Sequence, residues 1–255
     1  MKHEYMATGW SAPALGSVLQ KGTLWLARFL FFTAQFGHAM PAFAFPPYRS
    51  TDADTADPYT LELRVGVGKV EQERGETEVL TPLLRTNFGL PNRIELISEF
   101  EYLAEEGELG DGAAGVKWVP FYGGALSFGI ETLALLPVRS GDEGIGVESQ
   151  LLATFWGKGV RLHVNAGGFH DARVSPAEGG WRASLLAELP REGYRPGVEV
   201  FAKEVENEPT DVRAGLGLIY DVGGFDIRTG LHAGVTDEAP DLSFSLWITT
   251  KLPFR

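Results

Sequence analysis

Three polar residues of types that could do chemistry, Arg161, His163 and Asn165, occupy alternate positions of one short run. A histidine in such a place can act as the base for a nucleophilic serine. No serine can be assigned to His163 from the sequence, and the chain has no P-loop, dinucleotide-binding fingerprint or zinc-protease motif. We therefore favour His163 as an interior polar residue over a catalytic one, and predict no catalytic residue, metal site or cofactor.

The run that carries these residues is a predicted β-strand. Apolar and polar residues alternate through residues 160–167, and similar runs recur between Tyr59 and Lys251, about a dozen in all. Many are about ten residues long, which suits a tilted span of the hydrocarbon layer. We predict an all-β fold, an antiparallel up-and-down transmembrane β-barrel of about 12 strands, over residues 58–255. The run at 77–87 is the weakest because Pro82 interrupts it.

The connections between the runs are of two alternating kinds. Long acidic connections alternate with tight turns flanked by aromatic residues, and an up-and-down barrel would place each kind at one end. Outer-membrane barrels have longer extracellular loops, short periplasmic turns and aromatic girdles. A soluble meander gives no reason for this alternation, so a soluble periplasmic β protein is the weaker alternative. The predicted extracellular rim consists of Glu105, Glu106, Glu108, Asp111, Asp142, Glu143, Glu206, Glu208, Asp237 and Glu238. The predicted aromatic girdle consists of Phe88, Trp118, Phe121, Tyr122, Phe155, Trp156, Tyr194, Tyr220 and Phe225.

The polar faces of the predicted strands should point into the lumen. Such charges either line a water-filled path and set its selectivity, or pair across the lumen and plug it, and the sequence leaves both open. The predicted lumen residues are Arg64, Glu99, Lys117, Glu131, Glu148, Gln150, Arg161, His163, Asn165, Arg182, Glu188, Arg213, Asp226 and Arg228. Glycines within the strands either keep the lumen open or relieve crowding.

The N-terminal part resembles an export signal. An apolar stretch at 29–36 follows basic residues and precedes the small-x-small pattern at 42–44, which predicts a signal peptide over residues 1–44. Residues 45–57 then form a flexible acidic lead-in. The absence of cysteine suits an exported barrel held by its hydrogen-bond ladder.

Net charge limits the partners. At −12 the chain is a poor match for nucleic acid, whose phosphates need a basic surface. The expected partners are outer-membrane lipid and lipopolysaccharide, small-molecule solutes, and the barrel-assembly machinery during biogenesis. The acidic rim either binds divalent cations shared with lipopolysaccharide or, as we favour, is simply solvated.

Two segments carry a family resemblance. Residues 88–96, FGLPNRIEL, and residues 109–118, LGDGAAGVKW, resemble a turn and a loop-to-strand passage of the outer-membrane barrel family named for the meta-cleavage pathway of phenol degradation. The resemblance extends from Tyr59 to the C-terminus. It implies a transporter-type, porin-like barrel in the outer membrane of a Gram-negative cell, and no catalytic residues.

These observations lead to a first hypothesis, an outer-membrane channel or uptake barrel that passes small solutes, aromatic or hydrophobic ones among them, by passive diffusion. The acidic rim would favour cations and neutral molecules over anions. Two alternatives stay open: a non-conducting structural or anchor barrel, and an outer-membrane enzyme that acts on lipid.

Overall fold

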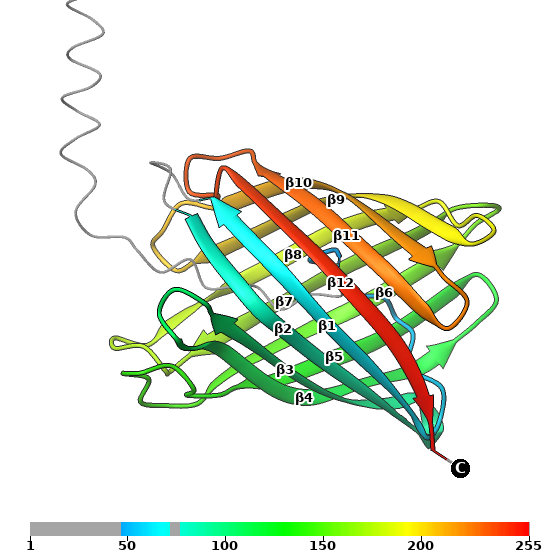
Figure 1. The fold of residues 1–255 in the computed structure, drawn as a ribbon, viewed down its shortest axis with the longest axis horizontal. Coiled ribbons are helices and arrows are strands. Elements are labelled where there is room, and N and C mark those ends of the chain that lie inside the picture. The colour runs from blue at the N-terminus through cyan, green and yellow to red at the C-terminus, as the bar shows by residue number, and fades with distance from the viewer. Residues whose placement is uncertain (1–46, 72–76, 255) are drawn as a thin grey trace, which may run out of the picture. The chain divides into compact units, whose positions relative to one another are not determined.

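The computed structural model describes residues 47–71 and 77–254, so the predicted signal peptide lies outside the described residues. Twelve antiparallel strands close into a barrel in which each strand pairs with its sequence neighbours and β1 pairs with β12 (Figure 1). The fold prediction is confirmed, including the strand number. In the described ranges no helix is both long and apolar enough to cross a membrane.

The strands are between 10 and 15 residues long. They are β1 (Thr60–Glu71), β2 (Thr77–Leu90), β3 (Ile94–Leu103), β4 (Glu108–Tyr122), β5 (Leu126–Leu135), β6 (Gly146–Trp156), β7 (Arg161–Asp171), β8 (Glu178–Glu188), β9 (Tyr194–Val205), β10 (Asp211–Asp221), β11 (Phe225–Gly234) and β12 (Leu242–Pro253). A single 3₁₀ turn, η2 (Pro91–Arg93), joins β2 to β3.

The two faces of the barrel wall differ as the alternation predicts. Successive side chains of a strand point to opposite faces, and the outward set is large and apolar: Val65, Leu151, Leu216 and Ile248 are examples from four strands, all exposed. The inward set is mostly polar and buried. Closure leaves no unpaired sheet edge, and the exterior is apolar. Both features are those of a membrane-spanning barrel.

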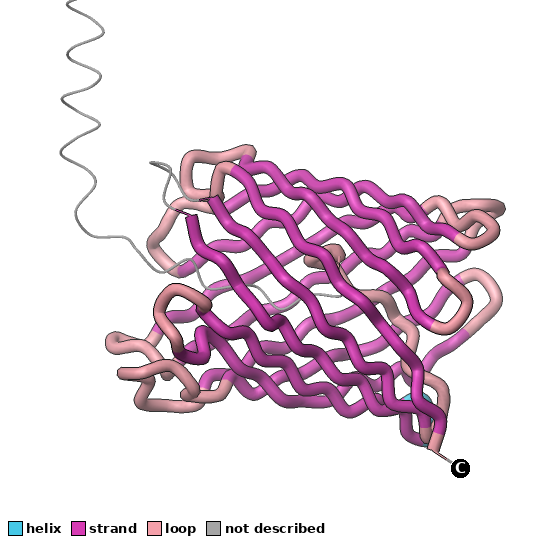
Figure 2. Tube along the Cα trace, viewed as in Figure 1, coloured by secondary structure: helices cyan, strands magenta, loops and turns pink. Residues whose placement is uncertain are grey.

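The connections separate to the two ends of the barrel (Figure 2). The turn end carries η2 and the turns at 123–125, 157–160, 189–193 and 222–224, together with the start of β1 and the end of β12. The loop end carries the longer acidic connections, of which the one from β5 to β6 spans residues 136–145. The predicted alternation of connections therefore corresponds to the two rims.

Pro82 lies inside β2 at a break in the strand pairing. The register between β2 and β3 shifts between Leu80 and Leu83, and the register of β1 with β2 shifts at the facing position, between Gly66 and Gly68. Proline lacks an N–H for the ladder and is tolerated in sheets at such bulges. The strand therefore continues through Pro82, but its inward positions change from even to odd numbers.

Residues 47–57 differ from the flexible lead-in that the sequence predicts. They belong to one compact unit with the barrel and run along the inside of its wall to the turn end, where β1 begins. Tyr48, Ser50, Thr51 and Ala53 are each at most 1% exposed. The composition of this segment, acidic and without periodicity, resembles a linker, and only the strands around it supply its partners.

Candidate functional site: the lumen

The predicted lumen residues lie on the inner face of the barrel. All are buried except Arg161 and Asp226, which are half-buried near the turn end. Several pair with one another or with neighbours on the same face: Arg182 pairs with Glu148, Arg228 with Asp226, and Gln150 donates to Glu131 at 3.0 Å. The interior is thus a connected polar network.

Several residues of this network are not among the predicted lumen residues. Glu95 and Glu101 occupy the same face of β3 as Glu99, and extending the alternation by two or four positions would have found them. Arg85 and Asn87 follow the bulge at Pro82, which reverses the assignment of faces. The buried Glu199 in β9 is the most consequential omission.

Glu199 holds the start of the lumenal segment, by which we mean residues 47–57. Its carboxylate accepts hydrogen bonds from the backbone N–H groups of Arg49 and Ser50, at 2.8 and 2.5 Å, and from the Ser50 hydroxyl. His232 of β11 contacts the same carboxylate at 2.8 Å through Nε2. A buried carboxylate with several donors is well solvated by the protein, so this contact is a strong anchor.

Further along, backbone groups of the segment form hydrogen bonds with side chains of the strands, as they would with the backbone of a neighbouring strand. Thr51 and Asn165 exchange two hydrogen bonds, from Thr51 N–H to Oδ1 at 2.8 Å and from Asn165 Nδ2 to the Thr51 carbonyl at 2.9 Å. Ala53 N–H donates to Thr154 Oγ1 at 2.8 Å. Side chains from several strands thereby satisfy buried backbone groups, which are costly to leave unpaired.

The turn-end part of the segment is held by Glu95, whose Oε2 accepts the Ala56 N–H at 2.6 Å. Asn87 donates to the other oxygen of the same carboxylate. Tyr59 N–H then donates to the Gly89 carbonyl at 2.7 Å, just before β1 begins. The segment is therefore attached from the middle of the lumen to its turn end.

Lys117 of β4 is the buried cation beside the turn-end part of the segment. Its Nζ lies 3.6–3.7 Å from carboxylate oxygens of Asp52, Glu95 and Glu131. It also donates to Thr51 Oγ1 at 3.0 Å. Three carboxylates around one buried ammonium link the segment to β3 and β5 electrostatically, and losing the ammonium would leave them mutually repelling.

Three glycines on neighbouring strands leave space for Pro47 and Tyr48. Gly217 of β10 is opposite Gly197 of β9 and Gly230 of β11 in the strand register. A Cβ added at Gly197 or Gly217 would overlap the Tyr48 ring, and one at Gly230 would overlap Pro47. The strand glycines at this level therefore make room for the segment itself.

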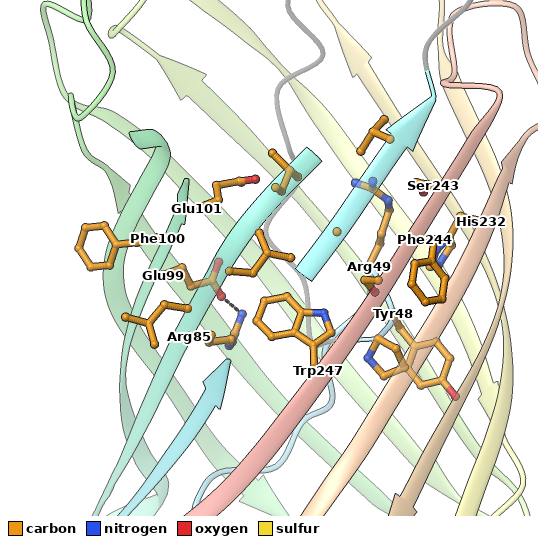
Figure 3. Close-up of a pocket in the computed structure, with 17 residues that line it drawn as sticks. Tyr48, Arg49, Arg85, Glu99, Phe100, Glu101, His232, Ser243, Phe244 and Trp247 are labelled. Carbon is orange, nitrogen blue, oxygen red and sulfur yellow. Dashed lines mark ion pairs between the residues drawn. The ribbon is translucent and has the colours of Figure 1, made fainter. Parts of the chain in front are cut away.

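The loop-end half of the lumen contains a cavity of about 140 Å³ beside the start of the segment (Figure 3). One wall is apolar and consists of Leu80, Leu83, Val70 and Trp247, which belong to a hydrophobic cluster that Leu103 completes behind the wall. The charged and polar groups that line the cavity are Arg49, Arg85, Glu99, Glu101, His232, Ser243 and Ser245. Arg85 and Glu99 are ion-paired, as the dashed line in Figure 3 shows.

The predicted acidic rim lies at the loop end with one difference. Most of its residues are exposed or half-buried, and Glu106 and Glu108 pair with Arg139. Asp111, however, is 2% exposed inside β4, because Arg173 from the β7–β8 loop reaches it.

Arg173 also binds Asp171 at 2.7 Å. Burial alone lowers the pKa of the Arg173 guanidinium, but its hydrogen bonds to Asp171 and the charge of Asp111 raise that pKa above its ordinary value. The loop is thus fixed to the wall by a cation that stays charged.

The predicted girdle residues lie near the turn end, most of them on the outer face. Trp118, Phe121, Tyr122 and Tyr220 are among those exposed there. Trp156 differs: it is paired with Arg161 in the register, on the inner face, and the Arg161 guanidinium stacks 4.2 Å from its ring centre. The alternation within β6 points this side chain inward, opposite to Phe155.

His163 lies in the interior, as its strand face predicts. Its Nδ1 is 2.9 Å from Thr154 Oγ1 and its Nε2 is 3.2 Å from Glu188. A lipid-acting enzyme would need a Ser–His pair on the outside of the barrel, and His163 does not face that side.

Comparisons with known proteins show the fold. No family model matches the sequence, and no curated protein sequence matches it. Among solved structures, an outer membrane channel from Pseudomonas putida F1 is 10% identical with a TM-score of 0.61, covering 79% of this chain and 98% of that one.

Two porins give similar results. NanC porin matches with a TM-score of 0.60 at 10% identity, over 75% of this chain and all of that one. KdgM porin matches with a TM-score of 0.55 at 10% identity, over 77% of this chain and 99% of that one. The protein therefore has the fold of outer-membrane, porin-like barrels.

Proposed function

We propose that this chain is an outer-membrane channel that passes small solutes by passive diffusion through a lumen narrowed by residues 47–57. One observation carries the proposal: a closed barrel with a lipid-compatible exterior has a charged interior that is partly filled and partly hollow. Charged groups in a lumen bind and select solutes, and passage requires that no group bind them too tightly.

The solute preference follows from the charges. The exposed carboxylates at the loop end attract cations and tolerate neutral molecules, through a local potential that salt screens. The resemblance of residues 88–96 and 109–118 to the family named for phenol degradation supports small aromatic or hydrophobic solutes, and the apolar wall beside Trp247 offers them a surface.

Single-channel recording tests the proposal. The chain that begins at Phe45, the predicted mature start, is refolded in detergent and inserted into a planar bilayer across a series of salts. Discrete steps with a preference for cations are expected. A folded barrel that never conducts would reject the channel.

A second candidate, a non-conducting anchor barrel, is favoured by the lumenal segment. Its hydrogen bonds and the ion pairs of Lys117 close much of the turn-end half. The same recording separates the two functions, because an anchor barrel gives no steps under any salt.

A further inference from the structure

We propose that the cavity in the loop-end half of the lumen is a binding site for a small zwitterion, an amino acid with an apolar side chain. This deepens the proposed function by naming a solute class for the same lumen. Binding itself does not require that the solute pass through.

The first observation is a buried carboxylate without a partner. Glu101 is 7% exposed and lines the cavity, and it makes no hydrogen bond or ion pair with any described residue. Its neighbour on the same face, Glu99, is satisfied by Arg85. The ionised form of a buried carboxyl group is costly without a partner, so Glu101 gains most from a ligand ammonium that can pair with it.

The second observation is a guanidinium that likewise makes no ion pair within the described residues. Arg49 lines the cavity, yet its side chain makes no ion pair or hydrogen bond within the described part of the chain, and its Nε is buried. Its nearest ring contact is Phe201, 5.6 Å from the guanidinium carbon to the ring centre. Figure 3 shows Glu101 and Arg49 separated from one another among the residues that line the cavity.

These two charges define the ligand. Of the other charged groups of the lining, Arg85 pairs with Glu99 and His232 with Glu199. Tyr48 also lines the cavity with a buried hydroxyl that lacks a partner in the described chain, but it is neutral, so Glu101 and Arg49 determine which charges a ligand needs. A cation alone would satisfy Glu101 and leave Arg49 unpaired, and an anion would do the reverse. A molecule with one ammonium and one carboxylate satisfies both through charge-assisted hydrogen bonds.

The apolar wall and the volume define the rest of the ligand. Leu80, Leu83 and Trp247 form a surface with no charge to satisfy. A cavity of about 150 Å³ in another protein holds benzene, so the 140 Å³ here matches the apolar side chain alone, up to one ring in size. The ammonium and carboxylate of the ligand must then lie at the edge of the cavity, against Glu101 and Arg49. Leucine and phenylalanine fit this description.

Equilibrium binding to the full barrel in detergent tests the site with three matched ligands. Phenylalanine carries both charges, phenethylamine only the ammonium, and 3-phenylpropionate only the carboxylate. Phenylalanine should bind at least about tenfold more tightly than either analogue, since each analogue loses one charge-assisted contact. Equal binding of phenylalanine and one analogue, or no binding of phenylalanine, would overturn the inference.

Two variants assign the contacts. Glu101→Gln should weaken the binding of phenylalanine and phenethylamine and leave the binding of 3-phenylpropionate unchanged. Arg49→Met should weaken the binding of phenylalanine and 3-phenylpropionate and leave that of phenethylamine unchanged. Glu192→Gln, in an exposed turn, is the matched control and should leave the binding of all three ligands unchanged. Heat-modifiable migration on a gel reports that each variant forms a closed barrel, and the wild-type ligand series stands whichever variants fold.

The inference and the proposed function fail separately. A chain that conducts but does not bind phenylalanine rejects the zwitterion site and keeps the channel. A chain that binds phenylalanine but never conducts keeps the site and rejects the channel.

Discussion

The two halves of the lumen are built from the same alternation of strand residues, yet they are filled differently. In the turn-end half, backbone N–H groups of residues 47–57 bind strand side chains, and Lys117 neutralises the surrounding carboxylates. In the loop-end half a cavity remains, with Glu101 and Arg49 unpaired among the described residues. A polar inner face thus determines what a lumen can bind, and a separate segment determines where it is closed.

The largest effect should come from removing the segment. A chain that begins at Pro58 keeps all strands and their pairing but loses residues 47–57, so the turn-end half fills with water. Single-channel conductance should rise several-fold relative to the chain that begins at Phe45. A chain with the same residues 47–57 in scrambled order is the control for length, and conductance unchanged by the deletion would show that the segment does not narrow the path.

Removing the central cation should be next in size. Lys117→Met leaves Asp52, Glu95 and Glu131 without their shared ammonium, and breaking a buried pair of this kind costs about 3–5 kcal/mol. Unfolding by urea in detergent should occur at a lower concentration, and surviving channels should prefer cations more strongly. Lys158→Met, in an exposed turn, should change neither quantity; equal behaviour of the two variants would contradict this arrangement.

Weakening the anchor should have an intermediate effect. Glu199→Gln replaces a charged acceptor of several donors with a neutral amide, which costs about 1.5–3 kcal/mol for hydrogen bonds to a charged group. Trypsin should then cleave after Arg49 at least about tenfold faster than in the wild type. Glu192→Gln is the matched control, and protection of Arg49 in both variants would speak against Glu199 as the anchor.

The smallest change concerns the glycine row. Gly217→Ala adds one methyl group that overlaps the Tyr48 ring, and Tyr48 can relieve the overlap only by moving away from the wall. A modest increase in trypsin cleavage after Arg49 is expected. Gly224→Ala, where an added Cβ meets nothing within 4 Å, should leave cleavage unchanged. If the two variants behave alike, the row does not seat the segment.

The strand sequences carry enough information to predict the wall but not its contents. Alternation is a local property, so residues 160–167 and their counterparts predict a barrel, and they predict that His163 and Asn165 face inward. Arg85 was missed because the bulge at Pro82 reverses the inward positions after it. Asp111 was placed on the rim because nothing in its own neighbourhood shows that Arg173, far along the chain, would reach it.

The lumenal segment was the hardest part to predict. Residues 47–57 have no periodicity, and their partners, such as Glu199 and Asn165, lie more than a hundred positions away. Gly217 and Gly230 were a signal in the sequence, because they are strand glycines on an inward face, but the sequence did not show what they accommodate and did not single out Gly197 beside them.

Cysteine cross-linking in the intact outer membrane tests most directly whether residues 47–57 occupy the lumen. The chain has no cysteine, so Ala53→Cys with Thr154→Cys introduces a single pair, at positions where the Ala53 backbone N–H donates to Thr154 Oγ1 at 2.8 Å. Thr132→Cys with Ser149→Cys, directly opposed on neighbouring strands, is the control pair. We predict that mild oxidation links both pairs to a similar extent. If the control pair links while the Ala53–Thr154 pair stays reduced, residues 47–57 do not occupy the lumen.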